Sequence, residues 1–404
     1  MSPDRRTFIQ RTAAVAGALS IGLLPRSAEG GTDTVPPAGP PRANDGVPRS
    51  RGRAPKPISI LILGGTGFTG PEQVEYALTR GHKVTLFNRN RTRPDFFKGK
   101  VDQLLGDLND DVSALKGKKF DLVLDNPTTF PAWVRNAAQH LKGNVGHYIF
   151  ISTISVYPDN SVPDRDETAG TTPMPADLDP YTIDRTKQGP FYGALKTFAE
   201  QEVARHYAGH HTIIRPGLIV GPLDRSDRFT YWPARIDRGG EVLAPGSPDD
   251  PCQFVDSRDL AEWTVRMGEA REPGTYNATS PVMPLAAMLY GIKAVTTAGA
   301  QFTWVPADFL ATQQVRGWRD MPVWMPAMGR TAGFLARNTA KAIAKGLTFR
   351  PLAVTAKDTL EWNKTRTADE QQALADGKVA GMSAAKEAEV LAAWKAKRKA
   401  EATP

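Results

Sequence analysis

Short apolar runs alternate with amphipathic segments through the first half of the chain. The runs at 58–63, 120–125 and 147–152 are rich in Ile, Leu, Val and Phe, which is typical of strands buried on both faces of a parallel sheet. Two weaker runs, at 83–88 and 101–105, fit the same interpretation. The pattern predicts an α/β fold built on a doubly wound parallel sheet.

A glycine turn follows the first of these runs. Gly64, Gly67 and Gly70 lie between the strand at 58–63 and a segment with an apolar face. A strand, a glycine turn and a helix together present backbone amides to a pyrophosphate, and a Cβ would keep the phosphates away. The spacing is G-x-x-G-x-x-G rather than G-x-G-x-x-G. We predict a Rossmann-type fold whose turn binds a dinucleotide through Gly64, Thr66, Gly67, Phe68 and Gly70.

The predicted second strand ends on polar residues that bear on the choice of cofactor. A carboxylate commonly binds the adenosine ribose at this place, whereas this chain has Asn88, Arg89 and Arg91. Without a carboxylate a 2′-phosphate is not repelled, and arginine offers fork-shaped donors to it. The residues therefore favour NADP over NAD; the alternative is that these arginines only face solvent.

Two later strand ends add candidate cofactor contacts. Asp107 follows the run at 101–105, where its carboxylate can accept a hydrogen bond from the adenine amino group. Asn126 follows the run at 120–125, at the carboxyl edge where open α/β sheets bind ligands.

Tyr192 and Lys196 are the strongest catalytic candidates. They are four residues apart, so on a helix they share a face. A free tyrosine has a pKa of about 10, and a neighbouring ammonium lowers the pKa by favouring the phenolate. Such a pair can take a proton from a substrate hydroxyl while hydride leaves the same carbon. A hydroxyl in the segment 152–155 would hold the reacting oxygen.

In combination these motifs resemble the extended and atypical short-chain dehydrogenase/reductases, the NAD-dependent epimerase/dehydratase group. The shared motifs include the glycine turn, G-D-L at 106–108, S-T-I-S-V-Y at 152–157 and the Y-x-x-x-K pair. The resemblance covers roughly residues 58–279 and is weaker beyond.

The resemblance implies a role for several residues. Thr153 is the hydroxyl donor, Tyr192 the general base, and Lys196 the residue that lowers the tyrosine pKa and holds the nicotinamide ribose. Pro216, in I-R-P-G, is placed among the cofactor contacts. The Asp-Glu pair of the sugar-nucleotide dehydratases is replaced by Ile154 and Ser155, so the groups for water elimination are missing.

The N-terminal segment resembles a twin-arginine export signal. Arg5 and Arg6 precede an uncharged apolar run at 13–24, which is shorter than the about 20 residues that span a bilayer. We expect the export machinery as a partner and a periplasmic or extracytoplasmic location. The predicted divisions are the signal at 1–26, a Pro/Gly linker at 27–57, the dinucleotide domain at 58–215, a substrate lobe at 216–380 with 250–280 returning to the dinucleotide domain, and a terminal helix and tail at 381–404.

Composition narrows the classes further. The net charge of +8 is concentrated before residue 57, and the remainder is near neutral, which argues against a nucleic-acid partner. Cys252 is the only cysteine, so no intrachain disulfide forms. His206 and His210 have helical spacing, but no carboxylate motif accompanies them, and we predict no metal. No apolar run after the signal reaches membrane length.

The predicted function is NAD(P)-dependent hydride transfer at a carbinol carbon of a small, sugar-like substrate, as an oxidoreductase or epimerase that retains its cofactor. The alternatives are a plain NADPH-dependent reductase and a non-catalytic NAD(P)- or RNA-binding relative. We expect the loop at 158–191 to cover the site and the aromatic and arginine residues at 227–235 to contact substrate. Arg258 and Asp259 are expected to brace the lobe. The sequence leaves the oligomeric state open.

Overall fold

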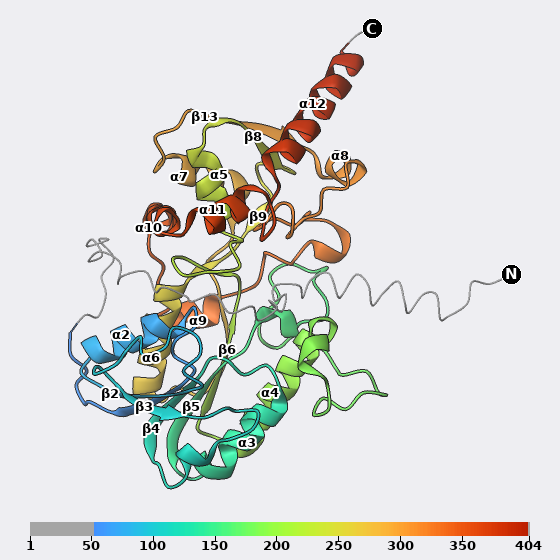
Figure 1. Ribbon diagram of the computed structural model, residues 1–404. Helices are drawn as coiled ribbons and strands as arrows, with labels where there is room; N and C mark the ends of the chain where they lie inside the picture. The colour runs from blue at the N-terminus through green and yellow to red at the C-terminus, as the bar shows by residue number, and fades with distance from the viewer. Residues whose placement is uncertain (1–51, 403–404) are drawn as a thin grey trace, which may run out of the picture.

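The computed structural model describes residues 52–402 (Figure 1). The predicted export signal and most of the linker lie outside the described residues. Within residues 52–402, no helix combines the length and the apolarity that a membrane crossing requires.

A seven-stranded parallel sheet forms the centre of the dinucleotide half. Its strand order is β11-β6-β5-β4-β1-β2-β3, so the chain starts in the middle, moves to one edge and then crosses back to the other. This confirms the predicted Rossmann-type α/β fold, and two strands, β2 and β4, have the predicted bounds. The strands are β1 (Ser59–Leu63), β2 (Lys83–Asn88), β3 (Asp102–Leu105), β4 (Phe120–Asp125), β5 (Val145–Ile151), β6 (His211–Pro216) and β11 (Gly274–Ala278).

Helices cover both faces of the sheet (Figure 1). On one face α2 (Gly70–Thr79) packs against α6 (Ser257–Ala270), and on the other α3 (Pro131–Leu141) packs against α4 (Tyr192–His206). Each face has its own apolar core, one including Val74 and Trp263 and the other including Val134 and Val203. The two cores explain why the central strands are apolar throughout rather than alternating.

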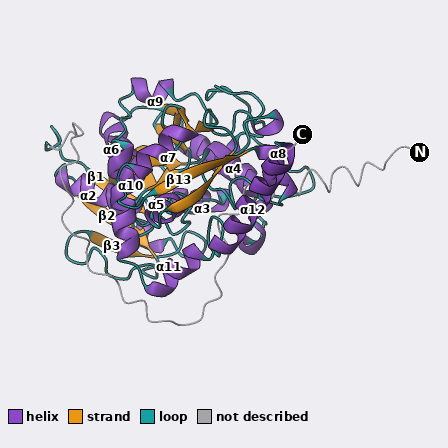
Figure 2. Ribbon diagram, turned by 90° about the horizontal axis from the view of Figure 1, so that it is seen from above, coloured by secondary structure: helices purple, strands orange, loops and turns teal. Residues whose placement is uncertain are grey.

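The substrate lobe is built around a two-stranded parallel pair, β8 and β13 (Figure 2). Trp232 and Trp324 lie in its core, fully buried. The predicted terminal helix is present as α12, and Glu387 anchors it by accepting from Arg235 at 2.5 Å and from the Leu243 amide at 3.0 Å. The lobe comprises α5 (Tyr231–Asp237), β8 (Gly240–Pro245), α7 (Leu285–Lys293), β13 (Ala300–Val305), α8 (Ala307–Thr312), α10 (Leu352–Lys364), α11 (Ala368–Ala375) and α12 (Ala384–Glu401).

Short elements connect the two halves. Beyond the predicted return at 250–280, the segment 340–349 also packs on the dinucleotide core, through Ala342, Leu347 and Phe349. The expected boundaries placed this segment in the lobe. The connecting elements are β7 (Ile219–Val220), β9 (Pro251–Cys252), β10 (Val255–Asp256), β12 (Met283–Pro284), α9 (Ala340–Ala344) and the 3₁₀ turns η1 (Ser113–Leu115), η2 (Ile154–Val156), η3 (Arg185–Lys187), η4 (Gly189–Phe191) and η5 (Gly329–Thr331).

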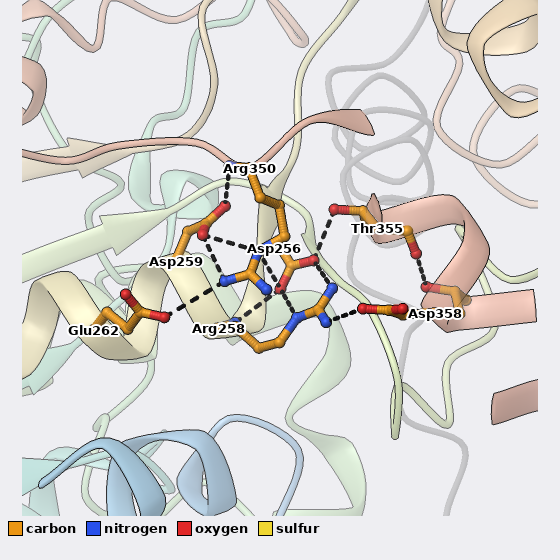
Figure 3. A network of polar contacts seen from close by, with 8 residues as sticks. Asp256, Arg258, Asp259, Glu262, Arg350, Thr355 and Asp358 are labelled. Atoms are coloured by element: carbon orange, nitrogen blue, oxygen red, sulfur yellow. Dashed lines mark hydrogen bonds and ion pairs between the residues drawn. The ribbon is translucent and has the colours of Figure 1, made fainter. Parts of the chain in front are cut away.

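A buried ion network closes the junction between the halves (Figure 3). Arg350 donates to Asp259 from its amide and from Nε, both at 2.9 Å, and from Nη2 at 2.7 Å. Arg258 donates to Asp256 through Nε at 2.9 Å and Nη2 at 2.7 Å, and it also pairs with Asp358 of α10. Arg258 and Asp259 therefore brace the lobe, as predicted.

Candidate active site

The glycine turn joins β1 to α2 in a shape that an added side chain would disturb. Gly64 and Gly65 have φ values of 86° and 84°, in the left-handed region that favours glycine. A Cβ on Gly70 would lie 2.5 Å from the Gly65 Cα, whereas a Cβ on Gly67 would meet nothing within 4 Å. The turn is thus closed on the protein side and open at Gly67, beside the first amides of α2. This geometry fits the pyrophosphate of a dinucleotide.

Two side chains, one at the end of β2 and one after it, donate hydrogen bonds to the glycine turn. Asn88 donates to the Gly64 carbonyl at 3.1 Å, and Arg93, which was not among the predicted contacts, donates to the Gly67 carbonyl. Burial and the nearby charge of Arg225 lower the pKa of Arg93. The guanidinium groups of Arg93 and Arg225 therefore lie close enough to interact at the turn, and Arg225 comes from the lobe.

The other predicted cofactor contacts of this region either bind other side chains or are exposed. Arg89 and Asp107, expected at the ribose phosphate and the adenine, face each other at 3.8 Å. Arg91 is exposed. Asn126 exchanges two hydrogen bonds with Gln73 of α2, at 2.7 and 3.0 Å, so its amide is fixed above the turn by a partner that the sequence did not reveal.

The remaining residues of the predicted set lie around this turn. Thr66 is buried and Phe68 is half-buried, both within the loop before α2. Pro216 is the last residue of β6 and is in register with Ala278 of β11. These residues lie at the carboxyl edge of the parallel sheet, where ligands of open α/β folds bind.

Tyr192 and Thr153 are brought together at the same edge. A Cβ on Gly193 would lie 2.3 Å from the Ser155 carbonyl, so the first turn of α4 rests directly on η2. Thr153 lies close enough to Tyr192 to lower its pKa, and Thr153 Oγ1 accepts from the Ser155 amide at 3.1 Å. Burial raises the pKa of Tyr192, while Thr153 and the charge of Arg228 act in the opposite direction.

The Lys196 ammonium is bound by backbone carbonyls. Its Nζ donates to the carbonyls of Thr128 and Ile151, both at 2.6 Å, and lies 4.2 Å from the Phe150 ring centroid. Burial lowers the pKa of Lys196 to about 8, against the opposing charges of Asp125 and Glu200. The charged group that acts on Tyr192 is Arg228 rather than Lys196. The two carbonyls fix the ammonium beside Ile151, the last residue of β5, and Thr128, three residues after β4.

Asp125 is a buried acid that sequence reasoning missed. It ends β4, accepts from the Tyr148 hydroxyl at 2.7 Å and is fully buried. Burial raises its pKa. Its position in an apolar strand, one residue before Asn126, was the available signal.

Arg228 enters the site from the lobe. Its Nε donates to Ser226 Oγ at 2.9 Å, and its guanidinium carbon lies 5.4 Å from the Trp318 ring centroid. Arg235, the other arginine expected near substrate, is instead paired with Glu387.

The long loop at 158–191 is placed by contacts on two sides. Asp164 donates its amide to the Ala336 carbonyl at 2.7 Å, which links the loop to the lobe. The hydroxyl of Tyr181 is bonded to Glu202 on α4, and the Arg135 guanidinium stacks on its ring at 3.8 Å. The loop thus packs beside α4 and the lobe.

Among residues 52–402, no group of three His, Cys, Asp or Glu is arranged to hold a metal ion. His206 instead faces Glu202 at 3.0 Å, and His210 Nδ1 faces the Ala208 carbonyl at 2.9 Å.

The fold and site define an α/β protein with a dinucleotide turn and a tyrosine at the carboxyl edge of its sheet. The sequence profile of the NAD dependent epimerase/dehydratase family matches residues 126–279. A 2-alkyl-3-oxoalkanoate reductase from Stenotrophomonas maltophilia (strain K279a) is 32% identical over 231 residues, which cover 54% of this chain and 67% of that protein.

A second relative has a different name. The chloroplast stem-loop binding protein of 41 kDa b from Arabidopsis thaliana is 28% identical over 218 residues, which cover 50% of this chain and 53% of that protein. This chain therefore spans about half the length of that relative.

Solved structures share the fold. A UDP-glucose 4-epimerase has a TM-score of 0.55 at 16% identity, over 76% of this chain and 98% of its own. MoeE5 in complex with UDP-glucose and NAD has a TM-score of 0.52 at 17% identity, with the same two coverages. The chain belongs to the NAD dependent epimerase/dehydratase family. This membership confirms the predicted class of cofactor, a nicotinamide dinucleotide.

Proposed function

We propose that the protein is an NAD(P)-dependent oxidoreductase or epimerase that transfers hydride at a carbinol carbon of a small, sugar-like substrate. The observation that carries the proposal is the packing of the first turn of α4, which bears Tyr192, on the segment after Thr153, at the sheet edge that also carries the glycine turn. Family membership and the sugar-epimerase fold of the structural neighbours support it. NADP remains our preferred cofactor, because Arg93 and Asn88 surround the turn where a carboxylate would repel a 2′-phosphate.

The chain's own residues suffice to handle the proton. In the oxidative direction Tyr192 takes the proton from the substrate hydroxyl while Thr153 hydrogen-bonds the same oxygen; in the reductive direction Tyr192 returns the proton to the carbonyl oxygen. The nicotinamide, when bound, accepts or supplies the hydride at the carbon. The amides at the start of α2, the open face of Gly67 and the side chains of Asn88 and Arg93 would hold the dinucleotide.

One observation favours the reductive alternative. Because burial raises the pKa of Tyr192, the phenol keeps its proton at neutral pH, and the protonated form is the one that donates to a carbonyl. The relative from Stenotrophomonas maltophilia is named as a reductase. A plain NADPH-dependent reductase is therefore our second candidate, and a non-catalytic RNA-binding role, suggested by the plant relative's name, is the third.

Cofactor retention and export are proposed together. The resemblance of Arg5 and Arg6 to a twin-arginine signal supports export of the folded protein from the cytoplasm, to a compartment where no pool of free cofactor is expected. A retained cofactor suits chemistry that returns its hydride in each cycle. Cell fractionation checks the location, and rapid loss of nucleotide on dilution would contradict retention.

The substitution Tyr192→Phe tests the catalytic part. It removes the proton-transfer hydroxyl, so we expect kcat to fall by about 100- to 10,000-fold, with nucleotide binding nearly unchanged. Turnover is followed by nicotinamide absorbance, and bound nucleotide by mass spectrometry of the purified protein. Tyr290→Phe, at an exposed lobe position, is the matched control. Absence of nucleotide in the protein, with no binding when it is supplied, would refute the enzyme proposal.

A further inference from the structure

Arg228 is the one lobe residue whose charge acts on the Tyr192 hydroxyl in the described part of the chain. It lies between β7 and α5, on the first stretch of chain that leaves the sheet for the lobe. The bond from Nε to Ser226 Oγ, 2.9 Å long, and the Trp318 ring at 5.4 Å fix the plane of the guanidinium. The side chain therefore has a defined orientation, which a solvent-facing arginine lacks.

The terminal nitrogens of Arg228 are left for a ligand. Within residues 52–402, neither makes a hydrogen bond, and no carboxylate lies within ion-pair distance of the guanidinium. The residue is nevertheless half-buried. Asp227, its neighbour in sequence, is already bound by Arg366 at 2.8 and 3.0 Å. The charge of Asp224 acts on Arg228 without a hydrogen bond between them, and Asp224 Oδ2 has no hydrogen-bond partner either. Half-burying a cation in this way is costly unless an anion completes it.

We propose that Arg228 binds a carboxylate of the substrate, so that the substrate is a hydroxy acid or oxo acid rather than a neutral alcohol or ketone. This rests on the proposed function, because the reacting oxygen lies on Tyr192 while the carboxylate lies on Arg228. A single planar fork with two free nitrogens matches one carboxylate in bidentate geometry. The acid is either a sugar acid or an aliphatic 3-oxo acid, and both present the same carboxylate.

Paired acids and esters test the proposal. The full-length protein with NADPH or NADH is given 3-oxohexanoate and glucuronate, each alongside its methyl ester, and kcat/KM is measured. We expect the wild type to prefer the acid by about 10- to 100-fold in at least one pair, and the reactive pair identifies the source of the carboxylate. Equal rates for acid and ester would overturn the proposal without any variant having to fold.

Variants then assign the preference to one side chain. Arg228→Gln is expected to raise KM for the acid about 10- to 100-fold and to abolish the acid preference, while Arg228→Lys restores part of it. Arg316→Gln, which removes an arginine whose side chain is 65% exposed in the same lobe, should change neither. An acid preference that survives Arg228→Gln would overturn the assignment.

Binding separates this proposal from the proposed function. If no compound turns over, calorimetric titration with 3-hydroxyhexanoate and glucuronate decides. Binding that is weakened by Arg228→Gln and unchanged by Arg316→Gln supports the carboxylate site even though the reaction proposal has failed. If Arg228→Gln and Arg316→Gln bind the acids equally well, or if the protein binds neither acid, the proposed carboxylate site is wrong.

Discussion

At the candidate site, the cationic side chains of the dinucleotide half differ from the one that the substrate lobe contributes. In the dinucleotide half, Lys196 is bound by two carbonyls, Arg89 faces Asp107, and Arg93 donates to the glycine turn. In the lobe, Arg228 donates one hydrogen bond, to Ser226, and its charge lowers the pKa of Tyr192. The comparison teaches that motif residues of the candidate site bind to the protein itself, while the group that we propose to bind substrate comes from the part of the chain where the family motifs are weaker.

The largest effect is expected where the two halves are joined. Arg350→Met removes the cation between Asp259 and Asp256, whose side chains are buried. Asp256 remains paired with Arg258, whereas Asp259 loses the guanidinium that binds it. Breaking such a pair costs about 3–5 kcal/mol of unfolding free energy. Urea unfolding measures this, and we expect both halves to lose stability together.

Lys345→Gln provides the control for the junction. Its ion pair with Glu272 lies on the same segment, and the lysine side chain is 44% exposed. An exposed pair contributes about 0–1 kcal/mol. A similar loss of unfolding free energy in Arg350→Met and Lys345→Gln would show that the buried network stabilises the junction no more than an exposed ion pair does.

A smaller effect, confined to the dinucleotide half, is expected from Glu269→Gln. Glu269 binds Arg80 at 2.6 and 2.8 Å and His82 at 2.7 Å, and these partners lower its pKa from 4.5 to about 2. The depressed pKa contributes stability at pH values above 4.5 that is lost as the pH falls through 4.5 towards 2. The difference corresponds to roughly 3 kcal/mol at pH 7.

Thermal unfolding at a series of pH values from 7 to 2 checks this. We expect Glu269→Gln to lower the melting temperature at pH 7, and the gap to the wild type to close as the pH approaches 2. Glu272→Gln, which removes a carboxylate just after the same helix, should produce a smaller gap. A gap that stays constant with pH would mean that the carboxylate charge is not responsible.

The smallest effect concerns the cofactor. Arg93→Gln removes a guanidinium that lies at the glycine turn, so we expect NADP binding to weaken by about 1 kcal/mol, several-fold in Kd. Fluorescence titration with NADPH and NADH measures it, and NADPH should be affected more. Arg330→Gln, at an exposed position of the lobe, is the control. An equal loss for both cofactors would remove Arg93 from the phosphate site.

Local sequence predicted the framework well and the charged contacts poorly. The bounds of β2 and β4 follow from apolar runs, because a strand buried on both faces needs no information from elsewhere. The approach of Tyr192 to Thr153 also follows from the motifs. Arg93 could not be found in this way, since it acts on Gly67, more than 25 positions away in the chain. Arg228 lies in the segment 227–235 that the sequence singled out, but its effect on Tyr192 became visible only in the structure. The role given to Lys196 stays a prediction; the sequence did not reveal that the Thr128 and Ile151 carbonyls bind its ammonium.

The path of the chain between the halves also bears on synthesis. Part of the dinucleotide core comes from Ala342, Leu347 and Phe349, far beyond the last strand of the sheet at Ala278. Once β11 has left the ribosome, every strand of the seven-stranded sheet has been synthesised, but part of the dinucleotide core has not. The apolar core on the α2–α6 face of the sheet is completed only after most of the lobe has been translated. We therefore expect chains truncated before residue 349 to expose part of this core and to bind chaperones.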